Sequence, residues 1–129
     1  MLGPTSPSGG GDVAALDPQL RGAERVREVF ARVHRGDDGV ADLYAEDGVV
    51  LVGGTRVEGR EAIRAFYGKT IETIHPKPEV QVVLSTPGSN FYTAIVEVPT
   101  DRGLLHALDL FTIDDDGIRQ LEIFDRTID

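Results

Sequence analysis

Two carboxylates near the C-terminal end of the sequence stand in runs of apolar residues. If residues 105–113 form a strand, every second side chain lies on one face, and Asp109 is the only polar residue of its face. Asp125 ends a second alternating run. The two sets are Leu105, Ala107, Asp109, Phe111 and Ile113, and then Leu121, Ile123 and Asp125. Because burial on an apolar face disfavours the charged form of a carboxyl group, Asp109 is a candidate acid or hydrogen-bond donor.

A turn between the two runs would bring these carboxylates together. Asp114 to Gly117 supplies turn residues, with glycine where a positive φ is most often needed. A three-residue loop predicts the pairs Asp114 with Ile118, Phe111 with Leu121, Asp109 with Ile123 and Ala107 with Asp125. Asp109 and Asp125 then become diagonal neighbours, about 5 to 8 Å apart at Cα. Two carboxyl groups this close lose their protons at different pH values because their negative charges repel. One would remain a protonated donor while the other is an anionic base, as acid/base chemistry on a carbonyl compound needs.

The composition indicates one globular domain with an acidic surface. The chain has 129 residues, with 22 Asp and Glu against 13 Lys and Arg, and a net charge of −9 at pH 7. This charge repels phosphate backbones and anionic lipids, so neither nucleic acid nor a membrane is an expected partner. No cysteine is present, and no apolar run approaches the roughly 20 residues of a membrane span. With no signal-peptide pattern either, we expect a cytoplasmic protein.

The helical signals lie in the N-terminal half. Residues 1–16 are rich in Gly, Pro and Ser and are expected to be a disordered tail, while residues 17–129 form a single domain. Apolar residues then recur at helical spacing in three segments. These predicted helices run from an N-cap at Asp17 to about residue 35, from Asp37 or Asp38 through Tyr44 to about Asp47-Gly48, and from Gly59 to about Pro76.

The strand signals lie between the second and third helices and throughout the C-terminal half. The predicted strands are residues 49–52, 56–58, 79–85, 90–99, 103–113 and 118–127. Helices followed by a meander of long strands are typical of an α+β fold. We expect the helices to cover one face of a curved, mostly antiparallel sheet and to close it into a cone with an interior.

Residues 44–67, YAEDGVVLVGGTRVEGREAIRAFY, and the C-terminal hairpin resemble the nuclear transport factor 2-like superfamily, in its SnoaL-like and ketosteroid isomerase-like branch. The resemblance extends over residues 18–127. It implies a cone-shaped fold with three N-terminal helices, a cavity for a hydrophobic small molecule, and a homodimer formed through the outer face of the sheet. The residues expected to line the cavity are Tyr44, Val52, Phe66, Tyr67, Phe111 and Ile123.

The functional positions of the resembling enzymes are kept only in part. The base of ketosteroid isomerases falls on Val52 and their oxyanion-hole tyrosine falls near Val29, whereas their oxyanion-hole aspartate matches Asp109. That enzyme is also a standard example of a carboxylic acid kept protonated by an apolar site. In the Asp-Arg-Asp set of limonene epoxide hydrolase-like members, Asp109 matches one aspartate, but Ala107 replaces the arginine and Ile123 falls at the second aspartate. SnoaL-like cyclases use a cavity carboxylate on these last strands, which Asp109 matches, whereas Asp125 is particular to this sequence.

The predicted function is therefore binding of a hydrophobic small molecule, with cofactor-free cyclase or isomerase chemistry on a polyketide-like or steroid-like carbonyl compound. Asp109 would be the donor and Asp125 the base. The alternatives are a non-catalytic ligand-binding or dimerisation module and an epoxide hydrolase-like enzyme. Tyr44 and Tyr67 face inward, either as core aromatics or with hydroxyls toward the ligand. The three histidines lack the spacing of a metal site, so neither a metal nor a cofactor is expected.

Overall fold

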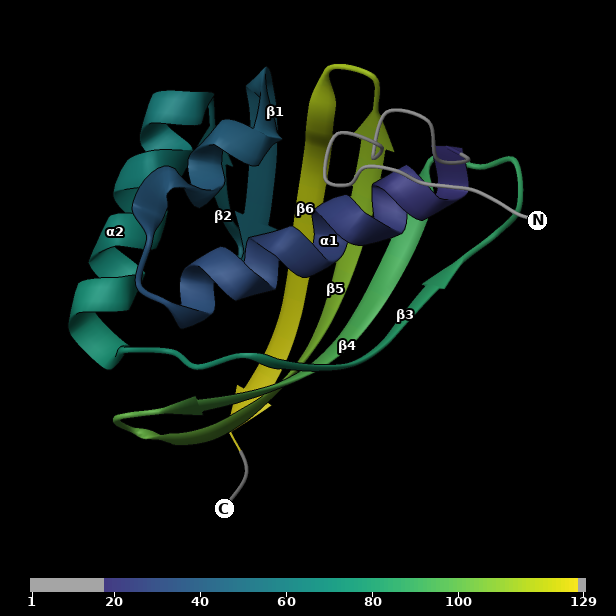
Figure 1. Ribbon diagram of the computed structural model, residues 1–129. Coiled ribbons are helices and arrows are strands. Elements are labelled where there is room, and N and C mark those ends of the chain that lie inside the picture. Colours follow the sequence, from purple (N-terminus) through teal and green to yellow (C-terminus); the bar gives the residue numbers. More distant parts are fainter. Residues whose placement is uncertain (1–17, 128–129) are drawn as a thin grey trace.

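The computed structural model describes residues 18–127, which form one sheet with its helices on one side (Figure 1). The predicted tail, residues 1–16, and the predicted cap Asp17 lie outside the described residues. The elements in chain order are α1 (Pro18–His34), the 3-10 helix η2 (Asp38–Leu43), β1 (Tyr44–Val52), β2 (Thr55–Glu58), α2 (Arg60–Ile74), β3 (Glu79–Ser85), β4 (Phe91–Thr100), β5 (Gly103–Asp114) and β6 (Gly117–Thr127).

The six strands form one sheet in the order β2-β1-β6-β5-β4-β3. Every neighbouring pair is antiparallel except β1 and β6, which are parallel because the chain crosses over between them. The strands bend strongly, and the tip of the β4–β5 hairpin sweeps beneath α2 (Figure 1). The expected fold class, helices packed on a curved, mostly antiparallel sheet, is confirmed.

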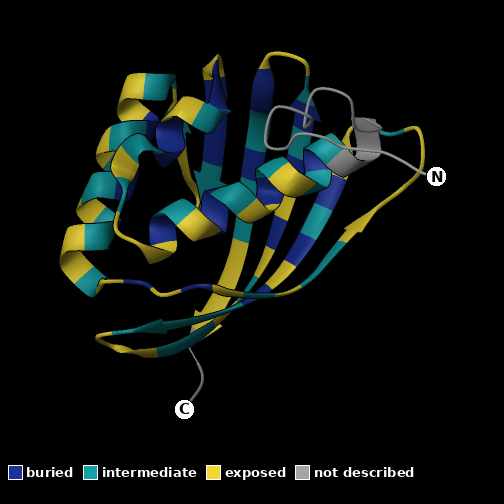
Figure 2. Ribbon diagram, viewed as in Figure 1, coloured by how far each residue is buried: buried dark blue, intermediate teal, exposed yellow. Residues whose placement is uncertain are grey.

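The core lies between α1, α2 and the inner face of the sheet (Figure 2). In α1, Val26, Val29, Phe30 and Val33 recur at helical spacing and are all buried, so the helix presents one apolar stripe to the strands. Phe30 meets Phe111 of β5 edge to face, with ring centroids 6.0 Å apart. The inward-facing residues of the strands are therefore covered by α1 over the middle of the sheet.

The prediction for the second helix was wrong at its C-terminal end. η2 is a 3-10 helix that stops at Leu43, and Tyr44 is the first residue of β1. Asp37 does cap the helix, because its side chain accepts a hydrogen bond from the Gly39 amide. Tyr44 instead pairs with Ile118 of β6, and this strand pairing outweighs the local helical spacing.

The β5–β6 hairpin keeps the predicted register along its length but not at its turn. Asp109 lies opposite Ile123, as predicted. Asp114 pairs with Gly117 and not with Ile118, so the turn has two residues and the three-residue loop was wrong. A bulge beside the turn then restores the register. Gly117 has a φ of 124°, which agrees with the predicted need for glycine there.

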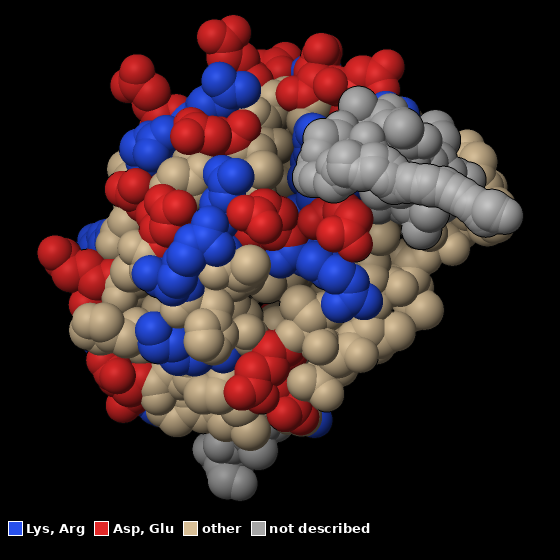
Figure 3. Space-filling view, viewed as in Figure 1, with Lys and Arg blue, Asp and Glu red and all other residues tan. Residues whose placement is uncertain are grey.

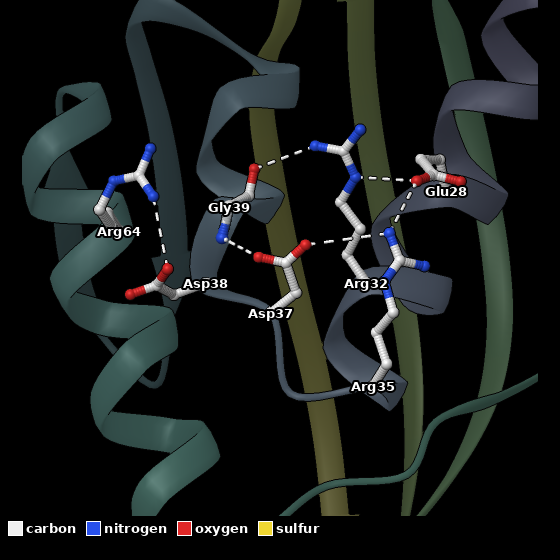
Figure 4. Close-up of polar contacts among 7 residues, drawn as sticks. All are labelled: Glu28, Arg32, Arg35, Asp37, Asp38, Gly39 and Arg64. Atoms are coloured by element: carbon white, nitrogen blue, oxygen red, sulfur yellow. Dashed lines mark hydrogen bonds and ion pairs between the residues drawn. The ribbon is translucent and has the colours of Figure 1, made fainter.

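A network of charged side chains joins the helices on the outside of the core (Figure 4). Arg32 donates to Glu28 at 2.8 Å and to the Gly39 carbonyl at 3.1 Å, which connects α1 to η2. Arg64 of α2 contacts Asp38 at 3.4 Å. Exposed pairs of this kind contribute about 0–1 kcal/mol each, so the network sets the helix arrangement more than the stability.

Charged side chains of both signs are interspersed over the helical face of the molecule (Figure 3). In the described part of the chain, neither helix combines the length and the hydrophobicity that crossing a bilayer requires.

Candidate functional site

Asp109 is the one buried charged residue recorded among the described residues, with 5% of its surface exposed. It projects from β5 onto the inner face, between Ala94 of β4 and Ile123 of β6. Its Oδ1 atom has no hydrogen-bond partner within residues 18–127. A buried polar atom without a partner is costly, and such atoms are rare in folded proteins.

Its surroundings raise the pKa of the Asp109 carboxyl group to near physiological pH. Burial raises the pKa of Asp109 from the usual 3.8 to about 7, and the negative charge of Asp125 adds to the rise. A carboxyl group with this pKa is partly protonated at neutral pH. It can therefore donate a hydrogen bond or a proton where an ordinary aspartate cannot.

Tyr44 and Tyr67 form a buried pair beside this carboxyl group. Their hydroxyl oxygens lie 2.6 Å apart and share a hydrogen bond. Burial raises the pKa of Tyr44 well above its usual value of 10, and neighbouring Tyr67 and Asp109 add to the rise. Burial also raises the pKa of Tyr67, against the lowering effect of its bond to Tyr44. Both phenols thus remain neutral donors, electrostatically coupled to Asp109.

Asp125 shares the inner face with Asp109 but is exposed. Ala107 lies opposite Asp125 and Asp109 lies opposite Ile123, which makes the two aspartates diagonal neighbours, as predicted. The sheet runs beyond the cover of the helices at this end of β6, so water reaches the second carboxylate. Asp125 stands at the rim of the cone and Asp109 inside it.

The other predicted ligand-binding residues lie at different depths. Val52 and Ile123 pair across β1 and β6, and both are only partly buried, as is Phe66 of α2. Phe111 is 1% exposed and packs on Phe30, so it lies in the deep core and not at the rim. The partly buried inward residues toward this end of the cone are Val52, Val57, Phe66, Val98, Ala107 and Ile123. They pack against the buried core on the inner face of the sheet, and we call them the mouth residues of the cone.

A hollow of about 890 Å³ lies along β1, β6, β5 and β4, and its lining includes Val52, Ala107, Ile123 and Asp125. Ile95, Leu108 and Phe124 line it, and they are directly opposite one another on β4, β5 and β6. These side chains are 41%, 39% and 49% exposed, which is unusual for large apolar residues. His106 also lines this hollow, with Nε2 3.5 Å from Glu97 Oε2, so it faces away from Asp109.

Within residues 18–127, no three His, Asp or Glu side chains come together as a metal site would need. The sequence did not predict the hydrogen bond between Tyr44 and Tyr67, although both residues were expected to face inward. The two tyrosines are 23 positions apart on different elements, and no local spacing signals that they meet.

The comparisons with known proteins agree with the fold described above. The model of the SnoaL-like domain family matches residues 26–121, most of the cone. The chain belongs to the SnoaL-like family. Its match covers both Tyr44 and Tyr67 and, on the last strands, Asp109. Comparison with curated protein sequences gives no match.

Several solved structures are similar to this chain in fold. SalBIII, an epoxide hydrolase/cyclase-like enzyme with a role in pyran ring formation in the polyether salinomycin, has 20% identity and a TM-score of 0.75, over 86% of this chain and 95% of that one. A protein from Jannaschia sp. assigned to the SnoaL-like polyketide cyclases has 17% identity and a TM-score of 0.72, over 85% and 89%. A protein from Sphaerobacter thermophilus has 28% identity and a TM-score of 0.64, over 81% and 94%.

Proposed function

We propose that this SnoaL-like protein binds a hydrophobic small molecule in the mouth of the cone and performs cofactor-free acid/base chemistry on a carbonyl group of that molecule. The observation that carries the proposal is the buried Asp109, whose Oδ1 lacks a partner among the described residues and whose pKa burial raises to about 7. An apolar lining with a few convergent polar groups is typical of small-molecule sites. The substrate class we favour is polyketide-like or steroid-like, because the mouth residues are aliphatic or aromatic.

The two aspartates would have different roles in this reaction. Asp125, as a carboxylate at the rim, removes a proton from the carbon next to the carbonyl group. Protonated Asp109 donates a hydrogen bond to the carbonyl oxygen, which gains negative charge as the enolate forms. Return of the proton to another carbon gives an isomer, and attack of the enolate carbon on a second carbonyl group gives a ring. Neither outcome needs an oxidant or a reductant.

The nearby positions argue against two related reactions. Val29 is 1% exposed within the core and Val52 lines the mouth, so neither can replace the tyrosine or the base of a ketosteroid isomerase. Ala107 lies beside Asp109 on the inner face, where an epoxide hydrolase-like set would need arginine. The buried tyrosine pair is the remaining donor near Asp109.

Exchange of carbonyl α-protons for deuterium tests the proposal without knowledge of the natural substrate. The probes are a β,γ-unsaturated steroid ketone and an aromatic 1,3-diketone in D2O, followed by NMR. Asp109→Asn should slow the protein-catalysed exchange about 100-fold or more, in the range of general acid catalysis. Asp115→Asn, the same change at an exposed turn residue of the same hairpin, should leave it unchanged. Equal exchange by wild type and Asp109→Asn would exclude Asp109 as the donor.

A non-catalytic ligand-binding module is the second candidate. Tight packing around Asp109 favours it, because Tyr44, Tyr67 and Phe111 are all at most 6% exposed and occupy the space next to the carboxyl group. A binder would take up the same probes without exchange, and Asp109→Asn would change affinity alone. Titration calorimetry beside the exchange assay separates the two functions.

For the outer sheet face we propose a second copy of this chain as the partner. The exposed ladder of Ile95, Leu108 and Phe124 is flanked by the row Glu97, His106 and Arg126, which pair across the same three strands. A self-complementary interface needs an apolar centre with a polar rim that carries both charge signs, and these two rows supply them.

A further inference from the structure

Arg60, the first residue of α2, makes an unusual contact with Tyr44. Its Nε and Nη2 both donate to the Tyr44 carbonyl oxygen, at 3.2 and 2.7 Å. Arg64, one turn further along the helix, contacts the carboxylates of Asp38 and Asp42 instead. A guanidinium presents its donors in a rigid fork, and its charge strengthens the hydrogen bonds. Arg60 thus holds a main-chain oxygen, whereas Arg64 pairs with charged side chains.

The Tyr44 carbonyl lies where β1 departs from regular pairing. Tyr44 pairs with Ile118 and Val49 pairs with Gln120. Residues 45–48 of β1 therefore bulge out opposite a single residue of β6. Main-chain groups at a bulge lose their ladder partners and need others. Arg60 supplies such a partner from outside the sheet.

The N-terminus of α2 is also tied to this bulge through the backbone. The Gly59 amide donates to the Gly48 carbonyl at 2.8 Å. A side chain on Gly48 would come within 2.9 Å of the Ile118 carbonyl oxygen, so the bulge has little room to move. Arg60 therefore acts on a segment whose backbone is already closely confined.

Helix α2 holds the other end of Tyr44 as well. Tyr67 lies seven residues after Arg60, two turns along the same side of the helix. Its hydroxyl bonds the Tyr44 hydroxyl at 2.6 Å. One helix thus fixes Tyr44 at the carbonyl, through Arg60, and at the hydroxyl, through Tyr67.

We propose that Arg60 is a positioning residue that holds Tyr44 in place, so that the Tyr44–Tyr67 pair stays packed beside Asp109 and keeps water from its carboxyl group. Arg60 does not touch the reacting atoms. Its effect on reactivity rests on the function proposed above, whereas its effect on the surroundings of Asp109 does not. Without the two hydrogen bonds, the start of β1 loosens and the cover over Asp109 opens.

The test measures the pKa of Asp109 by carbon-13 NMR of its carboxyl group, in protein that is folded at the temperature used. Arg60→Met should lower this pKa from about 7 toward the usual 3.8, because water relieves the cost of the buried charge. Arg60→Lys keeps the charge but not the fork and should give an intermediate value. Arg64→Met, a matched loss of charge on the same helix, should give the wild-type value.

The other results would overturn the proposal. An unchanged Asp109 pKa in Arg60→Met, with a lower melting temperature, would show a merely structural role. A higher pKa would show that Arg60 acts through its charge alone. If Arg60→Met does not fold, Arg60→Lys decides the matter, and a wild-type pKa in that variant contradicts the proposal.

Turnover gives an independent readout. In the deuterium exchange assay, Arg60→Met should lower kcat by about 10- to 100-fold with little change in KM, as expected when a reactive group is misplaced. If wild-type protein exchanges no probe, the proposed function fails, whereas the Arg60 proposal is still decided by the NMR titration.

Discussion

The hydroxyl oxygens of Tyr44 and Tyr67 lie 2.6 Å apart inside the core, where burial raises the pKa of both phenols and Asp109 adds to the rise. Tyr44 begins β1, Tyr67 lies on α2 and Asp109 lies on β5, so three separate elements meet at this point. Each phenol hydroxyl is the hydrogen-bond partner of the other. Among the buried side-chain nitrogen and oxygen atoms of the described residues, Asp109 Oδ1 alone has no partner, so it is free to bond a ligand.

Asp109 should make stability depend on pH. Because its folded pKa of about 7 exceeds the usual 3.8, the folded protein keeps a proton that the unfolded chain has released. The free energy of unfolding therefore falls as pH rises between these values, by about 4 kcal/mol at most. The contribution is complete below pH 3.8 and lost as pH passes 7. Asp109→Asn removes this pH dependence. In urea unfolding, the free energy of unfolding of the variant relative to that of wild type should therefore rise between pH 3.8 and about 7. A constant difference would contradict the raised pKa.

The tyrosine pair should show non-additive energetics. Tyr67→Phe leaves the buried Tyr44 hydroxyl without its partner and should cost about 1–3 kcal/mol of unfolding free energy. Removing both hydroxyls in the double variant with Tyr44→Phe should cost less than the sum of the single changes. Urea unfolding of the four proteins in the cycle measures the coupling. Strict additivity would show that the bond contributes nothing.

The outer sheet face should mediate self-association. Leu108→Glu places a charge in the centre of the exposed ladder and should convert a dimer to monomers in sedimentation velocity. Ala65→Glu, on the exposed side of α2, serves as the control and should remain dimeric. A wild-type protein that is monomeric at all concentrations would exclude the second copy as the partner of this face.

Two helical glycines should respond to alanine with opposite signs. In α1, a Cβ atom on Gly22 would overlap the phenol ring of buried Tyr92, and Gly22→Ala should cost about 1–3 kcal/mol. In α2, a Cβ on Gly68 would meet nothing nearer than Asp38 Oδ2 at 3.6 Å, and Gly68→Ala should stabilise by about 0.5–1 kcal/mol. Thermal unfolding of both variants measures the contrast. Stabilisation by Gly22→Ala would show that α1 moves freely over Tyr92.

Local patterns predicted most of the elements because their signals are short in range. The apolar spacing of Val26 to Val33 gave α1, and alternation along β5 placed Asp109 on the inner face. The same reasoning misplaced Tyr44, whose helical spacing with Val40 is overridden by pairing with Ile118. It also missed the bulge that corrects the β5–β6 turn, since a bulge depends on the facing strand.

The sequence by itself determined that an aspartate would lie on an apolar strand face and that Asp125 would be its diagonal neighbour, because side chains alternate along a strand regardless of what covers it. Only the tertiary structure decided that Asp109 is buried and Asp125 exposed, since burial depends on where the helices end over the sheet. It likewise decided that Arg60, Tyr44 and Tyr67 form one chain of contacts, because those bonds join residues that no local period relates.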